Sequence, residues 1–281
     1  MKKRNEEFTI EVDKKMKRLK EILGNCNSAV IAFSGGVDSS FLLDCAISVL
    51  GGNNVLAATI DSPLVPREEL AEAAEIAGRM EAYHLQVPLD VLNDQKLKKN
   101  PQDRCYVCKK KIYSLLMEVA EKRGYEVVLD GSNADDANFY RPGLLALREL
   151  SVCSPLMEAG LTKQDIRNLS QKRGLETWDK PAAACLASRV PYGDELSMEK
   201  LQLIADAEKY LRSLGIKKEL RVRMHCGIAR IEVDEQELPQ VINRRREISS
   251  KLREMGFIYV SLDLDGFRSG SMDRDNNGYK S

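Results

Sequence analysis

A glycine- and serine-rich segment, residues 34–40, has the residue types that bind a nucleotide phosphate. It reads Ser-Gly-Gly-Val-Asp-Ser-Ser and joins an apolar stretch at residues 28–33 to a predicted helix at residues 39–50. Glycines let backbone N–H groups approach a phosphate, and a helix N-terminus adds further donors and a favourable dipole. No lysine follows the glycines, so the segment is not a Walker-type loop.

This segment resembles the PP-loop of ATP pyrophosphatases, which split ATP between the α and β phosphates and leave AMP on the substrate; the alternative is an ordinary serine-rich turn. Two further segments extend the resemblance. Residues 59–62 stand where the superfamily holds adenine, and residues 130–136 resemble its second Gly-Ser/Thr-Asn-x-Asp segment. Carboxylates there are candidate Mg²⁺ ligands, although Asp135 is equally suited to cap a helix. The predicted site for ATP and Mg²⁺ comprises Ser34, Gly35, Gly36, Asp38, Ser39, Ser40, Thr59, Asp61, Gly131 and Asp135.

Three of the seven cysteines have a spacing or setting that favours sulfur or metal chemistry. Cys105 and Cys108 form a Cys-x-x-Cys pair at the start of a predicted helix, which puts both thiols on one face and favours thiolates. Cys185 lies in a loop rich in small residues. Three cysteines can hold a [4Fe–4S] cluster with one iron left open. Redox or persulfide chemistry and a structural role are the alternatives, whereas zinc would usually require a fourth ligand.

A pair of arginines alternates with apolar residues near the C-terminus. Arg221 and Arg223 share one face of a predicted strand, and Arg230 and Glu232 share a face of its hairpin partner. Two guanidiniums at this spacing can grip one phosphate through charge-assisted hydrogen bonds. The alternative is a solvated strand face.

These residues need a scaffold, and the first part of the chain predicts an α/β fold. Apolar, β-branched stretches alternate with helical patterns, which predicts a parallel sheet covered by helices on both faces. Ligands of such sheets bind at the carboxyl ends of the strands. The predicted strands are residues 28–33, 55–60, 82–87 and 126–130, and the predicted helices are residues 9–24, 39–50, 66–80, 106–123 and 161–173.

The pattern changes near residue 195. A long loop is predicted at residues 177–193, followed by a helix, a hairpin, a second helix and a last strand. We therefore predict two domains, a PP-loop domain at residues 1–194 and a smaller α+β domain for substrate binding and oligomerisation at residues 195–281. The later elements are predicted at residues 197–214, 220–224, 228–233, 235–255 and 257–264.

The composition is that of a globular protein, with 43% hydrophobic and 31% charged residues. Lysine plus arginine equals aspartate plus glutamate at 43 each, whereas a protein that handles nucleic acid usually carries a basic excess. The charged N-terminal stretch does not have the pattern of a secretory signal, and apolar runs are too short to span a bilayer. We expect a cytoplasmic protein that binds neither nucleic acid nor membrane.

Several segments resemble the LarE family. Members are PP-loop sulfur transferases that help to build the nickel-pincer nucleotide cofactor. The resemblance covers almost the whole chain and implies sulfuration of pyridinium-3,5-biscarboxylic acid mononucleotide to its thiocarboxylic forms. The segments that carry it are residues 100–109, 141–143, 154–156, 178–181, 184–189, 191–193 and 262–272.

The resemblance also implies roles for individual residues. Members with a single cysteine at the position of Cys185 give up its sulfur, whereas three-cysteine members are thought to bind a cluster that carries an extra sulfide. This chain has Cys105, Cys108 and Cys185 and resembles the cluster-bearing kind, reloaded by sulfide or another sulfur donor. The resemblance also suggests a homo-oligomer. It assigns catalytic positions to Cys185, Ser188 and Arg189, and the substrate phosphate to Arg221, Arg223 and Glu232.

Four other functions are compatible with parts of the pattern. A tRNA thiolase uses the same adenylation on a base, but its nucleic-acid binding calls for basic tracts that this chain lacks. An amide-forming synthetase has no need of the three cysteines. An ATP- or redox-sensing iron–sulfur protein would bind nucleotide without releasing pyrophosphate. A sacrificial-cysteine sulfur donor would need no cluster.

Overall fold

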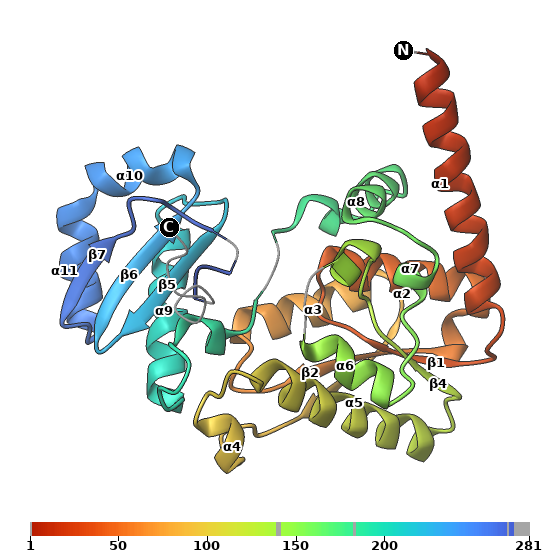
Figure 1. Cartoon of the computed structure of the whole chain (residues 1–281), viewed down its shortest axis with the longest axis horizontal. Coiled ribbons are helices and arrows are strands. Elements are labelled where there is room, and N and C mark those ends of the chain that lie inside the picture. The colour runs from red at the N-terminus through yellow and green to blue at the C-terminus, as the bar shows by residue number, and fades with distance from the viewer. Residues whose placement is uncertain (1, 139–141, 182–183, 269, 273–281) are drawn as a thin grey trace. The chain divides into compact units, whose positions relative to one another are not determined.

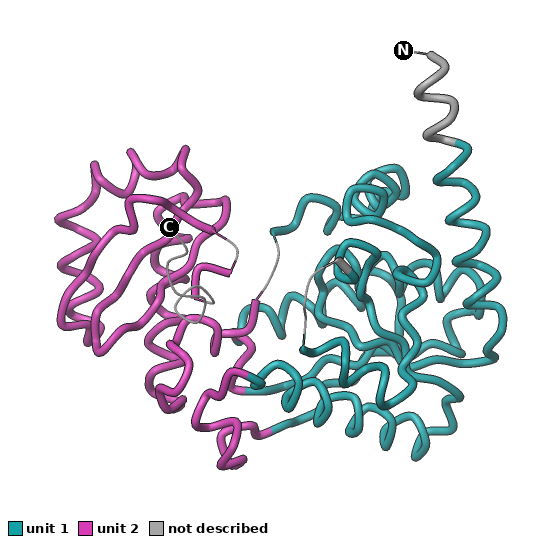
Figure 2. The backbone as a smooth tube through the Cα atoms, in the orientation of Figure 1, with its two compact units in different colours: residues 1–62, 67–89, 103–182 teal, residues 63–66, 90–102, 183–281 magenta. Residues whose placement is uncertain are grey.

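The computed structural model describes residues 2–138, 142–181, 184–268 and 270–272 (Figure 1). Of the segments that resemble the LarE family, residues 141 and 269 lie outside the described residues. The chain forms two compact units (Figure 2). Unit 1 comprises residues 1–62, 67–89 and 103–182, and unit 2 comprises residues 63–66, 90–102 and 183–281. Each unit is thus assembled from separate stretches of sequence, and the single boundary after residue 194 stays a prediction.

Unit 1 contains a four-stranded parallel sheet in the order β3-β2-β1-β4. This sheet and its flanking helices confirm the predicted α/β class. The strands are β1 (Ala29–Ala32), β2 (Val55–Asp61), β3 (Tyr83–Pro88) and β4 (Val127–Leu129). The helices of unit 1 are α1 (Lys2–Leu23), α2 (Val37–Leu50), α3 (Arg67–Arg79), α5 (Arg104–Arg123), α6 (Pro142–Glu149), α7 (Pro155–Glu158) and α8 (Lys163–Lys172), with short 3-10 turns at η1 (Gly52–Asn54), η2 (Ala134–Asn138) and η3 (Glu176–Asp179).

Both faces of this sheet are buried, which explains the continuous apolar strands. Ile31 packs into one core cluster with Phe41 of α2, while its neighbour Val30 packs into the other with Leu116 of α5. Burial of a side chain of this size contributes about 1.5–3 kcal/mol. Alternate residues of β1 therefore hold helices on opposite faces and fix the end of the strand from which residues 34–40 leave.

Unit 2 contains a three-stranded sheet in the order β5-β6-β7. β5 (Leu220–His225) and β6 (Ile228–Val233) form the predicted antiparallel hairpin, and β7 (Tyr259–Leu262) pairs parallel with β6. Leu220, Val222 and Ile231 line an apolar core. The other helical elements of unit 2 are α4 (Gln95–Lys98), η4 (Leu186–Arg189), α9 (Met198–Ser213), η5 (Glu235–Glu237), α10 (Leu238–Asn243) and α11 (Arg245–Met255).

Two sequence predictions of local structure were wrong. The continuous helix at residues 235–255 is divided into η5, α10 and α11, with Pro239 near the start of α10, where its fixed φ suits a helix N-terminus. The loop at residues 177–193 contains η3 and η4. In the part of the chain that the structure describes, none of the helices combines the length and the apolar character that a membrane crossing requires.

Candidate active site

The loop between β1 and α2 is fastened by its own serines. Ser39 Oγ accepts a hydrogen bond from the backbone N–H of Ser34 at 3.3 Å and donates to the carbonyl oxygen of Gly36 at 3.2 Å. Gly35 has φ +67°, and a Cβ there would lie 3.0 Å from Ala73 Cα. A glycine is therefore required both by conformation and by the close approach of α3.

Two polar atoms in this loop are buried without a partner among the described residues, Asp38 Oδ1 and Ser40 Oγ. A buried polar group without a hydrogen bond costs free energy, so such atoms mark a place where a ligand fits. The other Asp38 oxygen, Oδ2, lies 2.5 Å from Lys163 Nζ. Burial raises the pKa of Asp38 above its usual value, although the Lys163 ammonium opposes that shift.

The second predicted nucleotide segment packs directly on the first. A Cβ on Gly131 would lie 3.3 Å from the backbone nitrogen of Ser39, so only glycine fits without displacing the loop. Asp135 Oδ2 accepts the backbone N–H of Lys163 at 2.8 Å, and Asp135 N–H donates to Asn133 Oδ1 at 3.0 Å. The structure thus brings residues 34–40 and 130–135 together. It also ties Asp135 to the start of α8, while a magnesium-binding role for Asp135 stays a prediction.

Lys180 was not recognised as a site residue from the sequence. Its Nζ lies 3.1 Å from the carbonyl oxygen of Gly35 and 2.9 Å from Glu72 Oε2. Arg167 holds the backbone of this segment by donating to the carbonyl oxygen of Lys180 at 3.0 Å. Residues 178–181 belong to a segment that resembles the LarE family, but no periodicity or spacing placed the lysine beside the loop.

The end of β2 carries the predicted adenine residues. Thr59 Oγ1 lies 2.8 Å from Nε2 of His84, and the His84 ring packs edge-on against Phe33. Burial lowers the pKa of His84, which favours the neutral ring in this position. Asp61 is instead engaged by Arg67 at 2.5 Å in an exposed ion pair. His84 is thus a second neighbour of the nucleotide segments to which the sequence assigned no role.

Cys105 and Cys108 lie in the first two turns of α5, where Cys105 is exposed and Cys108 is half-buried. The next residue, Lys109, reaches Asp130 at 3.8 Å, and its side chain occupies the space that a Cβ on Gly143 would fill. Burial alone would raise the pKa of Asp130. The Lys109 ammonium and the Ser132 and Tyr113 hydrogen bonds nevertheless hold that pKa below its usual value. The start of α5 is therefore tied to the start of the second nucleotide segment.

In unit 2, Cys185 is exposed and forms the N-cap of η4. Its carbonyl oxygen accepts Ser188 Oγ at 2.8 Å and the guanidinium of Arg189 at 3.1 Å. Leu186 N–H donates to the carbonyl oxygen of Leu64 at 2.9 Å. The backbone of the turn is thus held on several sides while the thiol faces outward.

The side chain of Arg189 is buried beneath this turn and is only 3% exposed. It donates two parallel hydrogen bonds to the Glu208 carboxylate, both 3.0 Å, and also donates to the carbonyl oxygen of Ala184. Such a bidentate pair fixes the geometry of both partners. The structure therefore uses Arg189 to position the Cys185 turn from within.

The predicted phosphate-binding arginines share one face of β5, as expected. Arg223 donates to the carbonyl oxygen of Ser188 at 2.8 Å and to Glu232 Oε2 at 2.8 and 3.0 Å. The other oxygen of Glu232, Oε1, accepts Arg230 and Ser271 Oγ, both at 2.9 Å. Both oxygens of Glu232 are thus occupied, and Arg223 connects this charge cluster to the Cys185 turn.

Arg221 differs from its neighbour in its surroundings. It packs on the Phe267 ring at 5.1 Å and lies 3.4 Å from Glu219. Burial lowers the pKa of Arg221, and the nearby charges of Arg189 and Arg223 act in the same direction. The carboxylates of Glu208 and Glu219 oppose that shift, so charges of both signs surround Arg221.

The cysteines outside the candidate site have different surroundings. Burial raises the pKa of Cys45 to about 12, and burial together with Glu158 raises the pKa of Cys153 to about 12. Burial also raises the pKa of Cys26. These three thiols are poor thiolates and poor metal ligands near neutral pH.

The residues predicted for an iron–sulfur cluster fit one in the chemistry and exposure of their donors, since Cys105 and Cys185 are exposed and Cys108 is half-buried. Cys105 and Cys108 belong to unit 1, whereas Cys185 belongs to unit 2. Among the described residues, no group of three or more His, Cys, Asp or Glu side chains is placed to hold a metal ion. The three-cysteine ligand set therefore stays a prediction.

Residues 8–178 match the family described as the PP-loop domain. Together with the parallel sheet and the Ser-Gly-Gly-Val-Asp-Ser loop, this match defines the class: the chain is a PP-loop protein, and its ATP-using domain is confirmed.

Three relatives cover nearly the whole chain. The pyridinium-3,5-bisthiocarboxylic acid mononucleotide synthase of Lactiplantibacillus plantarum is 42% identical over 250 residues, 89% of this chain and 90% of that protein. Uncharacterised proteins of Synechocystis sp. and Methanocaldococcus jannaschii are 39% and 34% identical, covering 94% and 93% of this chain and 98% and 99% of their own lengths. The chain belongs to the LarE family of ATP-dependent sulfur transferases within the PP-loop proteins.

Proposed function

We propose that this enzyme adenylates the carboxylates of pyridinium-3,5-biscarboxylic acid mononucleotide and converts them to thiocarboxylates, with sulfur delivered at Cys185. The printed name of the Lactiplantibacillus relative, a bisthiocarboxylic acid mononucleotide synthase, supports this substrate. The observation that carries the proposal is a PP-loop in which Asp38 Oδ1 and Ser40 Oγ are buried without a partner among the described residues. The same chain exposes Cys185 on a turn held by Ser188 and Arg189.

The first step activates a poor leaving group. A substrate carboxylate oxygen attacks the α phosphorus of ATP, the bond to the β phosphate breaks, and an acyl-adenylate and pyrophosphate result. N–H groups at the start of α2 and the ammonium of Lys180 stabilise the charge that develops on pyrophosphate. Asp38, with an oxygen that has no partner in the part of the chain that the structure describes, and Asp135 would hold Mg²⁺, which neutralises phosphate charge when bound.

In the second step a sulfur nucleophile at Cys185 attacks the activated carbonyl carbon, and the bond to AMP breaks. Arg189 and Ser188 hold the turn so that the sulfur keeps its position. Cys105, Cys108 and Cys185 would hold a [4Fe–4S] cluster, which supplies a site for an exchangeable sulfide. The alternative is that the Cys185 thiolate displaces AMP to form a thioester. Loss of the Cα proton and cleavage of the Cβ–Sγ bond then release the thiocarboxylate and leave dehydroalanine at position 185.

The substrate phosphate is proposed to bind at the β5 arginines. Arg221 is the better candidate, because it shares a face of β5 with Arg223 but lies 3.4 Å from Glu219 and does not make the two-bond contact with Glu232 that holds Arg223. Glu232, with both oxygens occupied, serves to orient Arg223 and Arg230. In this proposal the smaller domain, from residue 195, supplies the substrate-binding strand. The enzyme works as a cytoplasmic homo-oligomer, and sulfide or another sulfur donor restores the sulfur after each transfer.

Adenylation is tested by isotope exchange between ATP and pyrophosphate. Exchange is expected with pyridinium-3,5-biscarboxylic acid mononucleotide and Mg²⁺, and not with tRNA in place of the mononucleotide. ATP–pyrophosphate exchange with tRNA and not with the mononucleotide would identify a tRNA thiolase. Exchange that requires a carboxylate substrate of an ammonia-dependent synthetase would identify an amide-forming synthetase.

The cluster is tested separately by anaerobic purification with iron and sulfide assays. We expect about four irons per chain in the wild type and their loss in Cys105→Ala. Iron-free wild-type protein that still makes thiocarboxylate, with loss of sulfur mass at Cys185, would assign the sulfur to the cysteine itself.

A further inference from the structure

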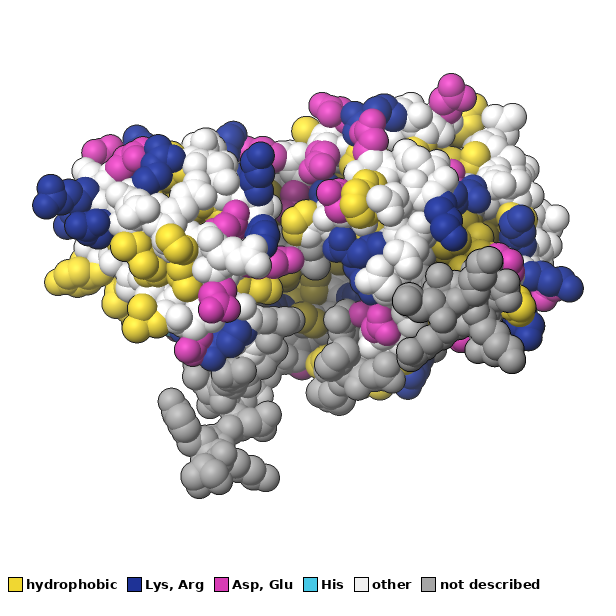
Figure 3. All heavy atoms as spheres, turned by 90° about the horizontal axis from the view of Figure 1, so that it is seen from above, with side chains coloured by type: hydrophobic (Ala, Val, Ile, Leu, Met, Phe, Trp, Pro, Cys, Tyr) yellow, Lys and Arg dark blue, Asp and Glu magenta, His cyan; other side chains and the backbone are white. Residues whose placement is uncertain are grey.

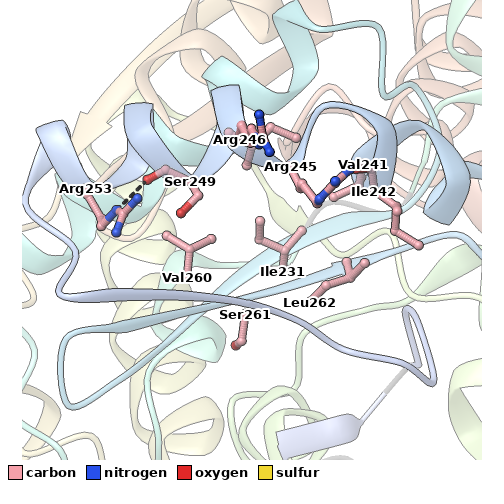
Figure 4. A pocket seen from close by; sticks show the side chains of 11 residues that line it. Ile231, Val241, Ile242, Arg245, Arg246, Ser249, Arg253, Val260, Ser261 and Leu262 are labelled. Carbon is pink, nitrogen blue, oxygen red and sulfur yellow. Dashed lines mark hydrogen bonds between the residues drawn. The ribbon is translucent and has the colours of Figure 1, made fainter.

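The apolar face of the unit 2 sheet is not completely covered by its helices. A cavity of about 490 Å³ lies between α10 and α11 on one side and β6 and β7 on the other. Ile231, Val260 and Leu262 project into it from the strands, and Val241 and Ile242 border it from α10 (Figure 4). Its volume lies within the range of about 300–1,000 Å³ that is usual for small-molecule sites.

Three arginines of α11 line the same cavity: Arg245, Arg246 and Arg253 (Figure 4). No Asp or Glu lines it, and among the described residues none of the three arginines has a carboxylate partner. Within the described ranges, Arg245 donates to the carbonyl oxygen of Ile242 and Arg253 to that of Ser249, both at 3.2 Å. The cavity therefore combines an apolar floor with uncompensated positive charge.

Other basic side chains on or next to α11 form ion pairs with carboxylates. Arg244 pairs with Glu247 at 2.9 Å, and Lys251 pairs with Glu254 at 3.5 Å. Arg245 and Arg246 moreover stand in the first turn of α11, where a positive charge opposes the helix dipole. Neither helix formation nor local ion pairing explains the arginines that line the cavity.

The space-filling view shows the same combination on the surface (Figure 3). Hydrophobic side chains gather on the left of the view, close to Lys and Arg side chains. Ile242 and Tyr259 are among the exposed large apolar residues of unit 2, at 48% and 67%. An apolar surface bordered by unpaired arginines is complementary to a ligand with an apolar body and an anionic head.

We propose that this cavity binds a small organic anion, a carboxylate or phosphate carried on an acyl or aryl body. The apolar floor takes the body, and Arg246 and Arg253 hold the head group through charge-assisted hydrogen bonds. Ile231 and its neighbour Glu232 point to opposite faces of β6. The cavity is therefore separate from the cluster formed by Arg223 and Glu232, and the inference does not rest on the proposed substrate.

The test is calorimetric titration of the full chain with octanoate, octyl phosphate, octanol and inorganic phosphate. At least one octyl anion should bind, and octanol and inorganic phosphate should each bind at least about tenfold more weakly. The tighter of the two octyl anions identifies the head group. The double variant Arg246→Gln/Arg253→Gln should lose about tenfold or more in affinity, whereas Lys251→Gln, on the same helix but outside the cavity, should bind as the wild type does.

Three results would overturn the proposal. The first is that the folded wild type binds neither octyl anion, or binds octanol equally well. The second is unchanged affinity in the double arginine variant, with its thermal unfolding unaltered. The third is a second copy in the cavity, seen as a wild-type dimer in sedimentation that Ser249→Trp separates into folded monomers.

Discussion

The ammonium group of Lys180 lies 3.1 Å from the carbonyl oxygen of Gly35, although 145 residues separate them in the chain. A phosphate-binding loop that contains no lysine of its own thereby acquires a cation from a distant segment. Glu72, at 2.9 Å, holds the same ammonium from the side of α3. This position beside the loop underlies the proposal that Lys180 stabilises charge on the departing pyrophosphate.

We predict that Lys180→Gln lowers the rate of ATP–pyrophosphate exchange by about tenfold to a thousandfold, the range for loss of one group that stabilises transition-state charge. Lys172→Gln, an exposed lysine of α8, is the control and should retain the wild-type rate. Equal rates for both variants would exclude Lys180 from the reaction.

The contact between the two nucleotide segments predicts a steric effect. Gly131→Ala should raise the KM for ATP by about tenfold, because the added methyl group lies 3.3 Å from Ser39 N and shifts the loop. Gly78→Ala, in α3 with no atom close to the added group, should leave KM unchanged and stabilise the protein by about 0.5–1 kcal/mol. An unchanged KM in Gly131→Ala would show that the loop tolerates the displacement.

Arg189 is predicted to act on sulfur transfer without acting on adenylation. Arg189→Lys keeps the charge but loses the two-pronged contact with Glu208. Sulfur transfer should fall by about tenfold or more, while ATP–pyrophosphate exchange is largely retained and alkylation of Cys185 becomes faster. Arg244→Lys, which alters an exposed pair with Glu247, should change stability by less than about 1 kcal/mol. Parallel loss of exchange and transfer in Arg189→Lys would mean that the arginine only supports the fold.

The cysteine pKa values predict a pH profile for alkylation of the native protein. Cys153, with its pKa raised to about 12, should react with iodoacetamide at least about a hundredfold more slowly than free cysteine at pH 8, and faster by about tenfold per pH unit above that. Glu158→Gln removes a hydrogen bond and a negative charge that raise this pKa, so Cys153 should then react faster at pH 8. Mass spectrometry of peptides measures each rate. Reactivity of Cys153 equal to that of free cysteine at pH 8 would contradict the raised pKa of Cys153.

The sequence predicted those parts of the fold that local pattern determines. Continuous apolar strands, the Gly-Gly turn before α2 and the alternation of β5 and β6 each depend on neighbouring residues, and all are confirmed. The break between α10 and α11 was missed because helical periodicity continues across Arg244, where the backbone leaves the helix. The apolar pattern of β7 also failed to show that this strand runs parallel to β6.

The parts of the candidate site that could not be predicted from the sequence depend on contacts between residues that are far apart in the chain. The positions of Lys180 beside Gly35 and of Lys163 beside Asp38 depend on how α8 and η3 pack in unit 1. Arg189 follows Cys185 in the sequence, and its expected role toward substrate stays a prediction, but its contact with Glu208 of α9 could not be predicted. A charged residue close to a nucleophile in the sequence can hold the backbone around that nucleophile as well as bind substrate.

The most direct test of the central claim is product analysis after incubation of the anaerobically purified enzyme with ATP, Mg²⁺, sulfide and pyridinium-3,5-biscarboxylic acid mononucleotide. We predict AMP, pyrophosphate and a mononucleotide in which sulfur replaces a carboxylate oxygen, seen by mass spectrometry in the wild type and absent with Cys185→Ser. A folded wild type that releases AMP without forming thiocarboxylate, or a Cys185→Ser variant that forms as much as the wild type, would contradict the account.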